Sequence, residues 1–314
     1  MALAFVFPGQ GSQAVGMGVE LADAFAASRE VFQEVDDALD QALSRLMRDG
    51  PIEDLTLTEN AQPALMAVSM AVMRALDREH GVAIAKAAFV AGHSLGEYSA
   101  LAATGALTLG DAARLLKRRG QAMQRAVPVS AGAMASLIGP KTDVALAEAA
   151  AAEGAKVGVC VVANDNNAGN VVISGEKAAV DAAIEEAKAL GARAIPLNVS
   201  APFHCPLMQP AADEMAEALA GAAIAQPLAP LVANITARPT VEPETIRRLL
   251  VEQVTGRVRW RESVEWLAGE GGVTRFAEAG AGKVLTGMAK RIAPDADAVA
   301  LNTPADLDAF ASSL

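Results

Sequence analysis

The residues Gly-His-Ser-Leu-Gly at positions 92–96 constrain the fold of this chain more than any other feature. They follow an apolar run at 87–91 and precede residues 97–103, which favour a helix. A strand, a sharp turn and a helix with Ser94 at the apex form a nucleophile elbow, in which the flanking glycines leave room for a strained serine. The same residues also fit an ordinary strand-to-helix turn with Ser94 as its N-cap.

The first turn of the expected helix also supplies free backbone N–H groups near Ser94. The backbone N–H of Leu95 and the free N–H groups after it point at the space in front of Ser94, where an oxyanion would need donors. A loop at 8–13, Pro-Gly-Gln-Gly-Ser-Gln, follows an apolar strand at 4–7. Its glycines let backbone N–H groups approach a ligand, although a plain turn is also compatible with them.

Composition excludes several classes of protein. The chain has 314 residues, 52% of them hydrophobic, and a net charge of −11, which argues against a general nucleic-acid binder. Only Cys160 and Cys205 occur, and no His/Cys cluster predicts a metal site. The apolar start at 1–7 lacks a basic region and predicts a core strand, not a signal peptide. No long uncharged apolar run occurs, so we expect a soluble, cytoplasmic protein.

Strands alternate with helices along most of the chain, which predicts a mostly parallel sheet covered on both faces. With the elbow, this indicates an α/β-hydrolase-like domain at 1–129 and 199–314. Its expected strands are 4–7, 87–91, 231–235 and, as the last one, 274–278. Its expected helices include 19–47, 62–79, 111–125, 207–219, 244–254, 263–268 and 284–292.

The order of expected strands and helices changes between residues 130 and 198. Expected strands at 133–138, 156–163, 170–174 and 193–197 alternate with helices at 143–152 and 176–190. This β-α-β-β-α-β order is that of the ferredoxin-like unit. We therefore expect 130–198 to be an inserted ferredoxin-like small domain.

A serine nucleophile needs a base, and the chain has only three histidines. His80 is expected at a helix end, and the side chain of His93 should point away from that of Ser94. His204 remains as the candidate base, in a loop stiffened by prolines on both sides. Cys205 offers a thiol alternative, but neighbouring residues of an extended loop point in opposite directions, so its pairing with His204 is sterically poor.

Lys117, Arg118 and Arg119 follow one another on the expected helix 111–125. Successive helical residues point about 100° apart, so the three cannot all face one way. Arg119 is next to Gly120, where the helix can approach another element closely. An arginine suits a carboxylate ligand because its planar fork donates two charge-assisted hydrogen bonds, but composition alone equally allows a solvated side chain.

Several motifs in order resemble the malonyl-CoA:acyl-carrier-protein transacylases of fatty acid synthesis. They are Phe-Val-Phe-Pro-Gly-Gln-Gly-Ser-Gln at 5–13, Gln-Pro-Ala-Leu at 62–65, Gly-His-Ser-Leu-Gly-Glu-Tyr at 92–98, Arg-Gly-x-x-Met-Gln at 119–124, Val-Ile-Ser-Gly at 172–175 and Ala-Pro-Phe-His-Cys at 201–205. The resemblance runs over nearly the whole chain.

The resemblance implies a role for each matching residue. Ser94 would be the acylated nucleophile, His204 its base, Arg119 the ligand of the malonyl carboxylate, and the backbone N–H groups of Gln10 and Leu95 the oxyanion hole. Gln253 would orient the histidine through its main-chain carbonyl, although the residues after it, Val-Thr-Gly-Arg, depart from the usual pattern. Phe203 resembles the malonyl-selecting residue of related polyketide enzymes.

The resemblance also implies partners and a mechanism. Malonyl-CoA and acyl carrier protein would react in turn at Ser94 in a ping-pong transfer that needs no cofactor and no metal, in a protein that we expect to be a monomer. Three alternatives stay open: a serine hydrolase such as an esterase, a polyketide-type acyltransferase or malonate-decarboxylase subunit, and a non-catalytic scaffold that docks carrier protein.

Overall fold

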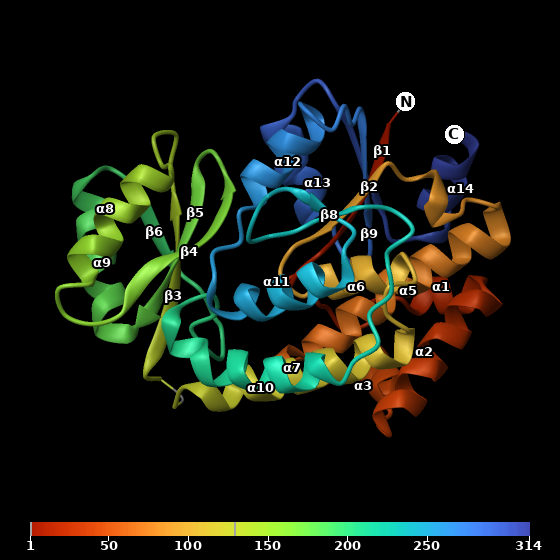
Figure 1. Ribbon diagram of the computed structural model, residues 1–314, viewed down its shortest axis with the longest axis horizontal. Coiled ribbons are helices and arrows are strands. Elements are labelled where there is room, and N and C mark those ends of the chain that lie inside the picture. Colours follow the sequence, from red (N-terminus) through yellow and green to blue (C-terminus); the bar gives the residue numbers. More distant parts are fainter. Residues whose placement is uncertain (1, 129) are drawn as a thin grey trace.

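Two β-sheets, each with its own helices, make up the computed structural model, which describes residues 2–128 and 130–314 (Figure 1). The fold is mixed α/β, with one mostly parallel sheet and one antiparallel sheet. The expected domain boundary at 129 and the Met1 end of the expected first strand lie outside the described residues. Across the part that is described, no helix is both long and apolar enough to span a membrane.

The larger sheet has six strands, and all its neighbouring pairs are parallel except β7 with β8. Phe7 pairs with Gly92, so the loops that follow β1 and β2 leave the sheet side by side. In order across the sheet, the strands are β10 (Asp297–Leu301), β9 (Arg275–Ala279), β1 (Leu3–Phe7), β2 (Phe89–Gly92), β7 (Leu231–Val232) and β8 (Pro239–Thr240).

Helices cover both faces of this sheet, as the alternation along β1 requires. Phe5 and Phe7 belong to one apolar core, whereas Ala4 and Val6 belong to another on the opposite face. The second core is closed by α12 (Trp260–Ala268) and α13 (Val284–Ile292). The first core involves α1 (Val19–Ala24), α2 (Ala26–Leu39), α3 (Leu43–Asp49), α4 (Ile52–Thr56), α5 (Thr58–His80), α6 (Gly96–Ala103), α7 (Leu109–Ala126), α10 (Gln209–Ala220), α11 (Pro243–Thr255) and α14 (Pro304–Ser312). Two short 3-10 turns lie at Ile84–Lys86 and Pro206–Met208.

The smaller sheet is antiparallel, with α8 (Val144–Gly154) and α9 (Lys177–Ala189) on its outer side (Figure 1). Leu137 and Ile173 pack in an alanine-rich core under these helices, while Met134 and Val172 join the large core on the other face. Its strands, in order across the sheet, are β4 (Cys160–Asn167), β5 (Asn170–Glu176), β3 (Gly132–Ile138) and β6 (Arg193–Pro196).

The segment after α11 joins the small sheet to the large part of the molecule. The N–H of Val258 donates to Ala163 O at 2.8 Å, and the N–H of Asp165 donates to Val258 O at 2.9 Å. The Asp165 carboxylate is buried and pairs with Arg261 of α12 at 2.8 Å. Hydrogen bonds to charged groups strengthen with burial, so this pair reinforces the backbone bonds.

Several expected boundaries were wrong. The strand at 274–278 is not the last, because β10 and α14 follow it, and the helical stretch 19–47 is three helices, with Asp40 at a left-handed φ of 47°. The strand expected at 156–163 begins only at Cys160, since the chain turns after α8, and it continues through polar residues to Asn167. β7 ends at Val232, three residues before the expected end of that strand.

Gly120 allows α7 to lie against the start of α5. A Cβ at this position would come within 2.5 Å of Glu59 Cα and 2.7 Å of Thr58 O, which are backbone atoms that cannot move independently. This close approach fixes the depth at which the neighbouring Arg119 enters the core. Gly287 of α13 is a contrast, because a Cβ there would meet no atom within 4 Å.

We therefore expect Gly120→Ala to lower the free energy of unfolding by about 1–3 kcal/mol, because overpacking displaces one helix from the other. Gly287→Ala should raise it by about 0.5–1 kcal/mol, since alanine loses less backbone entropy in a helix. Urea denaturation of the two variants measures both values. Equal stability of Gly120→Ala and the parent protein would show that the α5–α7 contact is not as tight as described.

Candidate active site

Ser94 stands at the apex of the turn between β2 and α6, with a left-handed φ of 52°. Glycines are required on both sides of it. A Cβ on Gly92 would lie 1.9 Å from the Gly96 carbonyl carbon, and a Cβ on Gly96 would lie 2.3 Å from Phe7 O. The turn is therefore a nucleophile elbow packed directly against the end of β1.

His204 faces Ser94, and its Nε2 is 2.8 Å from Ser94 Oγ. Its Nδ1 lies 2.9 Å from Gln253 O and 3.1 Å from Gly256 O. Because both carbonyls can only accept, Nδ1 carries the proton, and Nε2 is left to accept from the serine hydroxyl. The two side chains thus have the geometry of a nucleophile and its base, with backbone carbonyls in place of an acidic residue.

Burial of His204 and the nearby charge of Arg119 lower the pKa of the imidazole from its usual 6.5 to about 3. Desolvation is the larger cause because it disfavours the charged form. The imidazole is therefore neutral at pH 7, which is the state a general base requires.

Arg119 is 1% exposed, and its guanidinium lies against the serine. Nη2 donates to Ser94 Oγ at 3.1 Å and to Gln253 Oε1 at 2.8 Å, and Nη1 donates to Gln62 Oε1 at 2.7 Å. All three acceptors are neutral. A buried cation among neutral acceptors lacks a directly bonded counter-charge, so the position suits an anionic group of a ligand.

The other two cations of the run, Lys117 and Arg118, differ from Arg119 because each pairs with a carboxylate. Lys117 Nζ lies 3.1 Å from the Glu59 carboxylate, and Arg118 Nε lies 3.1 Å from that of Glu214. Of the three, only Arg119 points into the core, in agreement with the spacing argument that they cannot share one direction.

Gln10 and Leu95 both line the cleft that contains Ser94. Within residues 2–128 and 130–314, neither of their backbone N–H groups has a hydrogen-bond acceptor in the protein. Gln10 is held by its side chain, whose Oε1 accepts from Thr58 Oγ1 at 2.8 Å. Two free backbone donors beside a serine are what a tetrahedral oxyanion needs.

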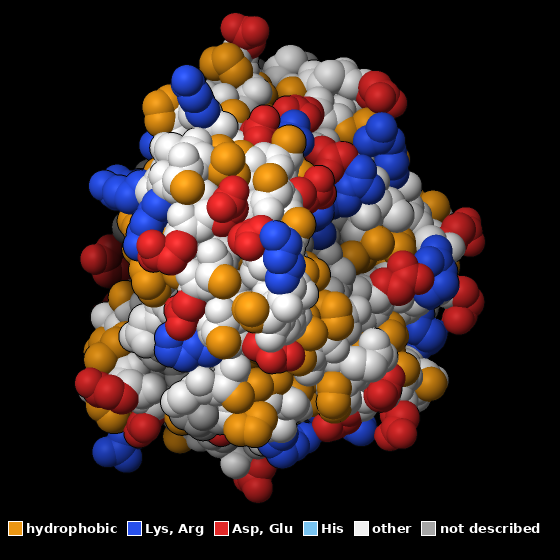
Figure 2. Space-filling model, turned by 90° about the vertical axis from the view of Figure 1, so that its left-hand side faces the viewer, with side chains coloured by type: hydrophobic (Ala, Val, Ile, Leu, Met, Phe, Trp, Pro, Cys, Tyr) orange, Lys and Arg blue, Asp and Glu red, His pale blue; other side chains and the backbone are white. Residues whose placement is uncertain are grey.

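The cleft measures about 380 Å³ and lies between the two sheets. The smaller sheet supplies Ser136, Asn164, Asn166 and Asn170 as polar lining, whereas Phe203 borders it from the loop that carries His204. On the outer face of the small part, drawn in Figure 2, basic and acidic side chains are interspersed and form no patch of one sign.

Asn234, Glu97 and Gln62 join this site, although no role was assigned to them from sequence. Asn234 Oδ1 accepts from Ser94 N at 2.8 Å, and its Nδ2 donates to Gly92 O at 2.7 Å, so one amide holds both the strand end and the apex of the elbow. Its position after a strand of a parallel sheet was a usable signal, because ligand sites lie at carboxyl ends of such strands.

Glu97 is buried behind the elbow, where desolvation raises its pKa to about 7. It accepts from Asn234 N at 2.6 Å and from Gln253 Nε2, and Gln253 Nε2 also donates to Ser94 O at 3.0 Å. The carboxylate therefore orients the Gln253 amide so that its Oε1 faces Arg119.

The two rival side chains do not reach the serine. The Cys205 thiol is buried and donates to Pro202 O at 3.0 Å, and burial raises its pKa, which disfavours the nucleophilic thiolate. His93 Nε2 lies 2.9 Å from Asn166 Oδ1 and so points away from Ser94.

The sequence is similar to those of known acyl transferases. A family model described as an acyl transferase domain matches residues 4–299. The chain is 45% identical to the malonyl CoA-acyl carrier protein transacylase of Escherichia coli strain K12, with 98% of this chain and 97% of that protein covered. It is 43% identical to the Bacillus subtilis strain 168 protein of the same name, with 98% and 95% covered.

Solved structures show the same similarity. An acyl-carrier-protein S-malonyltransferase from Bartonella henselae superposes with a TM-score of 0.96 at 52% identity, covering 100% of this chain and 99% of that one. A malonyl-transacylase in complex with its type II polyketide acyl-carrier protein superposes with a TM-score of 0.96 at 43% identity, covering 100% of both chains.

The low pKa of His204 generates a prediction about pH. Because the imidazole stays neutral far below its usual range, labelling of Ser94 by a fluorophosphonate should keep a constant rate from about pH 8 to about pH 5 in Glu97→Gln, which removes the buried carboxyl whose pKa of about 7 lies in that range. The rate in His204→Ala should be much lower at every pH. Mass spectrometry of the labelled protein over time measures both rates. A decline in Glu97→Gln with a midpoint near 6.5 would contradict the low pKa of the buried His204 imidazole.

Proposed function

The chain belongs to the acyl transferase family, and we propose that it transfers a malonyl group from malonyl-CoA to the phosphopantetheine thiol of acyl carrier protein in fatty acid synthesis. One observation carries the choice of acyl group. The buried guanidinium of Arg119 donates to Ser94 Oγ and otherwise meets only neutral acceptors. An acyl group attached to Ser94 would therefore place a terminal carboxylate beside a cation that has no directly bonded anion.

The first half-reaction starts from the Ser94–His204 hydrogen bond. His204 Nε2 takes the hydroxyl proton while Ser94 Oγ attacks the thioester carbonyl carbon, and the backbone N–H groups of Gln10 and Leu95 donate to the resulting oxyanion. The C–S bond then breaks, and the departing thiolate of CoA receives the proton from Nε2. The thiol of the carrier arm attacks the malonyl-serine ester by the reverse sequence, which restores the Ser94 hydroxyl.

Binding of a malonyl carboxylate would also change the pKa of the base, His204. The positive charge of Arg119 helps to lower the pKa of His204. A carboxylate paired with that guanidinium offsets its charge, so the imidazole becomes more basic when the correct substrate is bound. Acyl groups without a carboxylate do not supply this effect.

Two further residues have supporting roles in this proposal. Gln253 orients His204 through its carbonyl and holds Arg119 through its side-chain amide. Phe203 precedes the histidine and borders the cleft, where its ring leaves little room for a branch on the acyl chain.

The finer description of the fold belongs to the same proposal. We assign an α/β-hydrolase-like domain to 1–129 and 199–314, supported by the parallel strands and the elbow. We assign a ferredoxin-like domain to 130–198, supported by the order β6-β3-β5-β4 in an antiparallel sheet. We further propose a cytoplasmic monomer that uses no cofactor.

The test of the proposed reaction is the mass of the protein after mixing with malonyl-CoA. We expect a malonyl adduct on the Ser94 peptide, none in Ser94→Ala, and formation slowed by a factor on the order of 10² or more in His204→Ala, which loses its general base. Cys205→Ser is the control and should acylate normally. Rapid release of free malonate without an adduct would instead indicate a hydrolase, and loss of the adduct in Cys205→Ser alone would indicate a thiol nucleophile.

Substrate choice is tested at Arg119. Removing one partner of a buried ion pair costs roughly 3–5 kcal/mol, so Arg119→Ala should lower kcat/KM for malonyl-CoA by about two to four orders of magnitude. Acetyl-CoA has no terminal carboxylate to leave unpaired, so its kcat/KM should fall far less or rise. Arg118→Ala, one position earlier on α7 and partly exposed, should change neither value. If Arg119→Ala lowers both thioesters by the same factor, the arginine does not select the malonyl group.

A further inference from the structure

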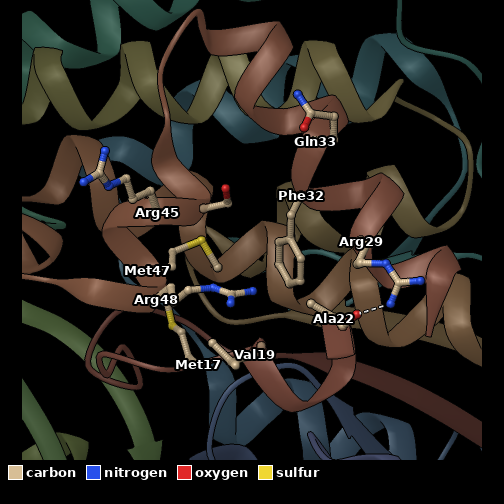
Figure 3. Close-up of a pocket in the computed structure, with 11 residues that line it drawn as sticks. Met17, Val19, Ala22, Arg29, Phe32, Gln33, Arg45, Met47 and Arg48 are labelled. Atoms are coloured by element: carbon tan, nitrogen blue, oxygen red, sulfur yellow. Dashed lines mark hydrogen bonds between the residues drawn. The ribbon is translucent and has the colours of Figure 1, made fainter. Parts of the chain in front are cut away.

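A second cavity, of about 340 Å³, lies between α1, α2 and α3 (Figure 3). Among the described residues, none of those that line it also lines the cleft around Ser94. Ligand sites in proteins range from about 300 to 1,000 Å³, so this cavity has the size of a site for a small ligand.

The floor of the cavity is apolar. The Phe32 ring and the Met47 side chain, 7% and 2% exposed, form its base. Met17, Val19 and Ala22 extend this surface toward α1. Such a floor gains free energy when hydrocarbon covers it, at roughly 25 cal/mol per Å².

The rim of the cavity is basic. Arg29, Arg45 and Arg48 line it, and its described lining contains no aspartate or glutamate, although the whole chain has a net charge of −11. In Figure 3 the Arg48 guanidinium lies between Met47 and Phe32, Arg29 flanks Ala22, and Arg45 points away from them.

The charges of these arginines are only loosely compensated. Arg48 lies 3.9 Å from Asp23 and Arg45 lies 3.8 Å from Asp49, and all four side chains are exposed. Arg29 Nη1 donates to the carbonyl of Ala22 at 2.5 Å, which is a neutral acceptor. Each guanidinium has five donors, so Arg29 and Arg48 retain free N–H groups for an anion.

We propose that this cavity binds an aliphatic carboxylate, with its chain on Phe32 and Met47 and its carboxylate on Arg29 and Arg48. An inorganic anion would leave the apolar floor uncovered, and a neutral hydrocarbon would leave the two guanidinium groups without an acceptor. Only a molecule with both parts satisfies the floor and the rim. The proposal does not depend on the reaction at Ser94.

Ligand binding here is expected to order the loop that joins β1 to α1. Met17 and Gly18 of this loop line the cavity, and the N–H of Gly16 donates to Met47 O at 2.8 Å. A chain packed on Met17 and Met47 would hold these two segments together. Amide hydrogen exchange should therefore slow in peptides from this loop and from α3.

The experiment is calorimetric titration of the full chain with decanoate, paired with hydrogen exchange. We expect one decanoate per chain, with about tenfold or greater weakening in the double variant Arg29→Gln/Arg48→Gln. Both side chains are exposed, so the variant should fold. Arg114→Gln, which removes an exposed arginine of α7 outside the cavity, is the matched control and should bind as the parent does. Arg119→Ala should also bind normally.

Several results would overturn the proposal. They are absence of decanoate binding at millimolar concentration, unchanged affinity in the double variant, or loss of binding in Arg119→Ala, which would place decanoate in the cleft around Ser94. Decanol binding as tightly as decanoate would show that the arginines do not take part. Inorganic phosphate binding as tightly as decanoate would show a simple anion site.

Discussion

The contact between the end of β1, the end of β2 and the first turn of α6 determines most of this site. Gly96 packs on the carbonyl of Phe7, and Gly92 packs on the carbonyl of Gly96, at separations that no side chain allows. The backbone conformation of Ser94 follows from this contact and is held by the Asn234 amide. Because β1 and β2 are neighbours, the same contact brings the loop with Gln10 beside the serine.

Around this backbone frame, a small set of buried polar groups depend on one another. Arg119 lowers the pKa of His204, while Gln253 binds both the cation and the imidazole and is itself oriented by Glu97. Burying a cation without a directly bonded anion is unfavourable, and folding of the rest of the chain has to offset that cost. If a ligand carboxylate binds Arg119 as we propose, this unfavourable interaction is relieved, and part of the folding free energy is converted into selectivity for charged acyl groups.

The features that could be predicted from sequence are those that depend on residues close to one another along the chain. The elbow follows from five residues, and the inward position of Arg119 agrees with its place beside Gly120, where α7 touches α5. The role of Asn234 depended on tertiary contacts that span more than a hundred residues, so local pattern could not supply it. The expected end of β4 was too early because Asn164, Asp165 and Asn166 lack strand propensity, yet the two asparagines line the polar cleft and Asp165 pairs with Arg261.

The segment between Gly256 and Val258 both bonds the side chain of His204 and joins the small sheet to the rest of the molecule. Its Gly256 carbonyl accepts from the imidazole of His204, and two residues later its backbone pairs with β4 of the small sheet. A folding intermediate in which only the large sheet has formed would therefore contain the serine and the histidine but would lack the bonds that hold this segment in place. In that intermediate Gln253 O of α11 can still accept from Nδ1 of His204, so one carbonyl would hold the imidazole instead of two, and docking of the small sheet would be the step that fixes the second.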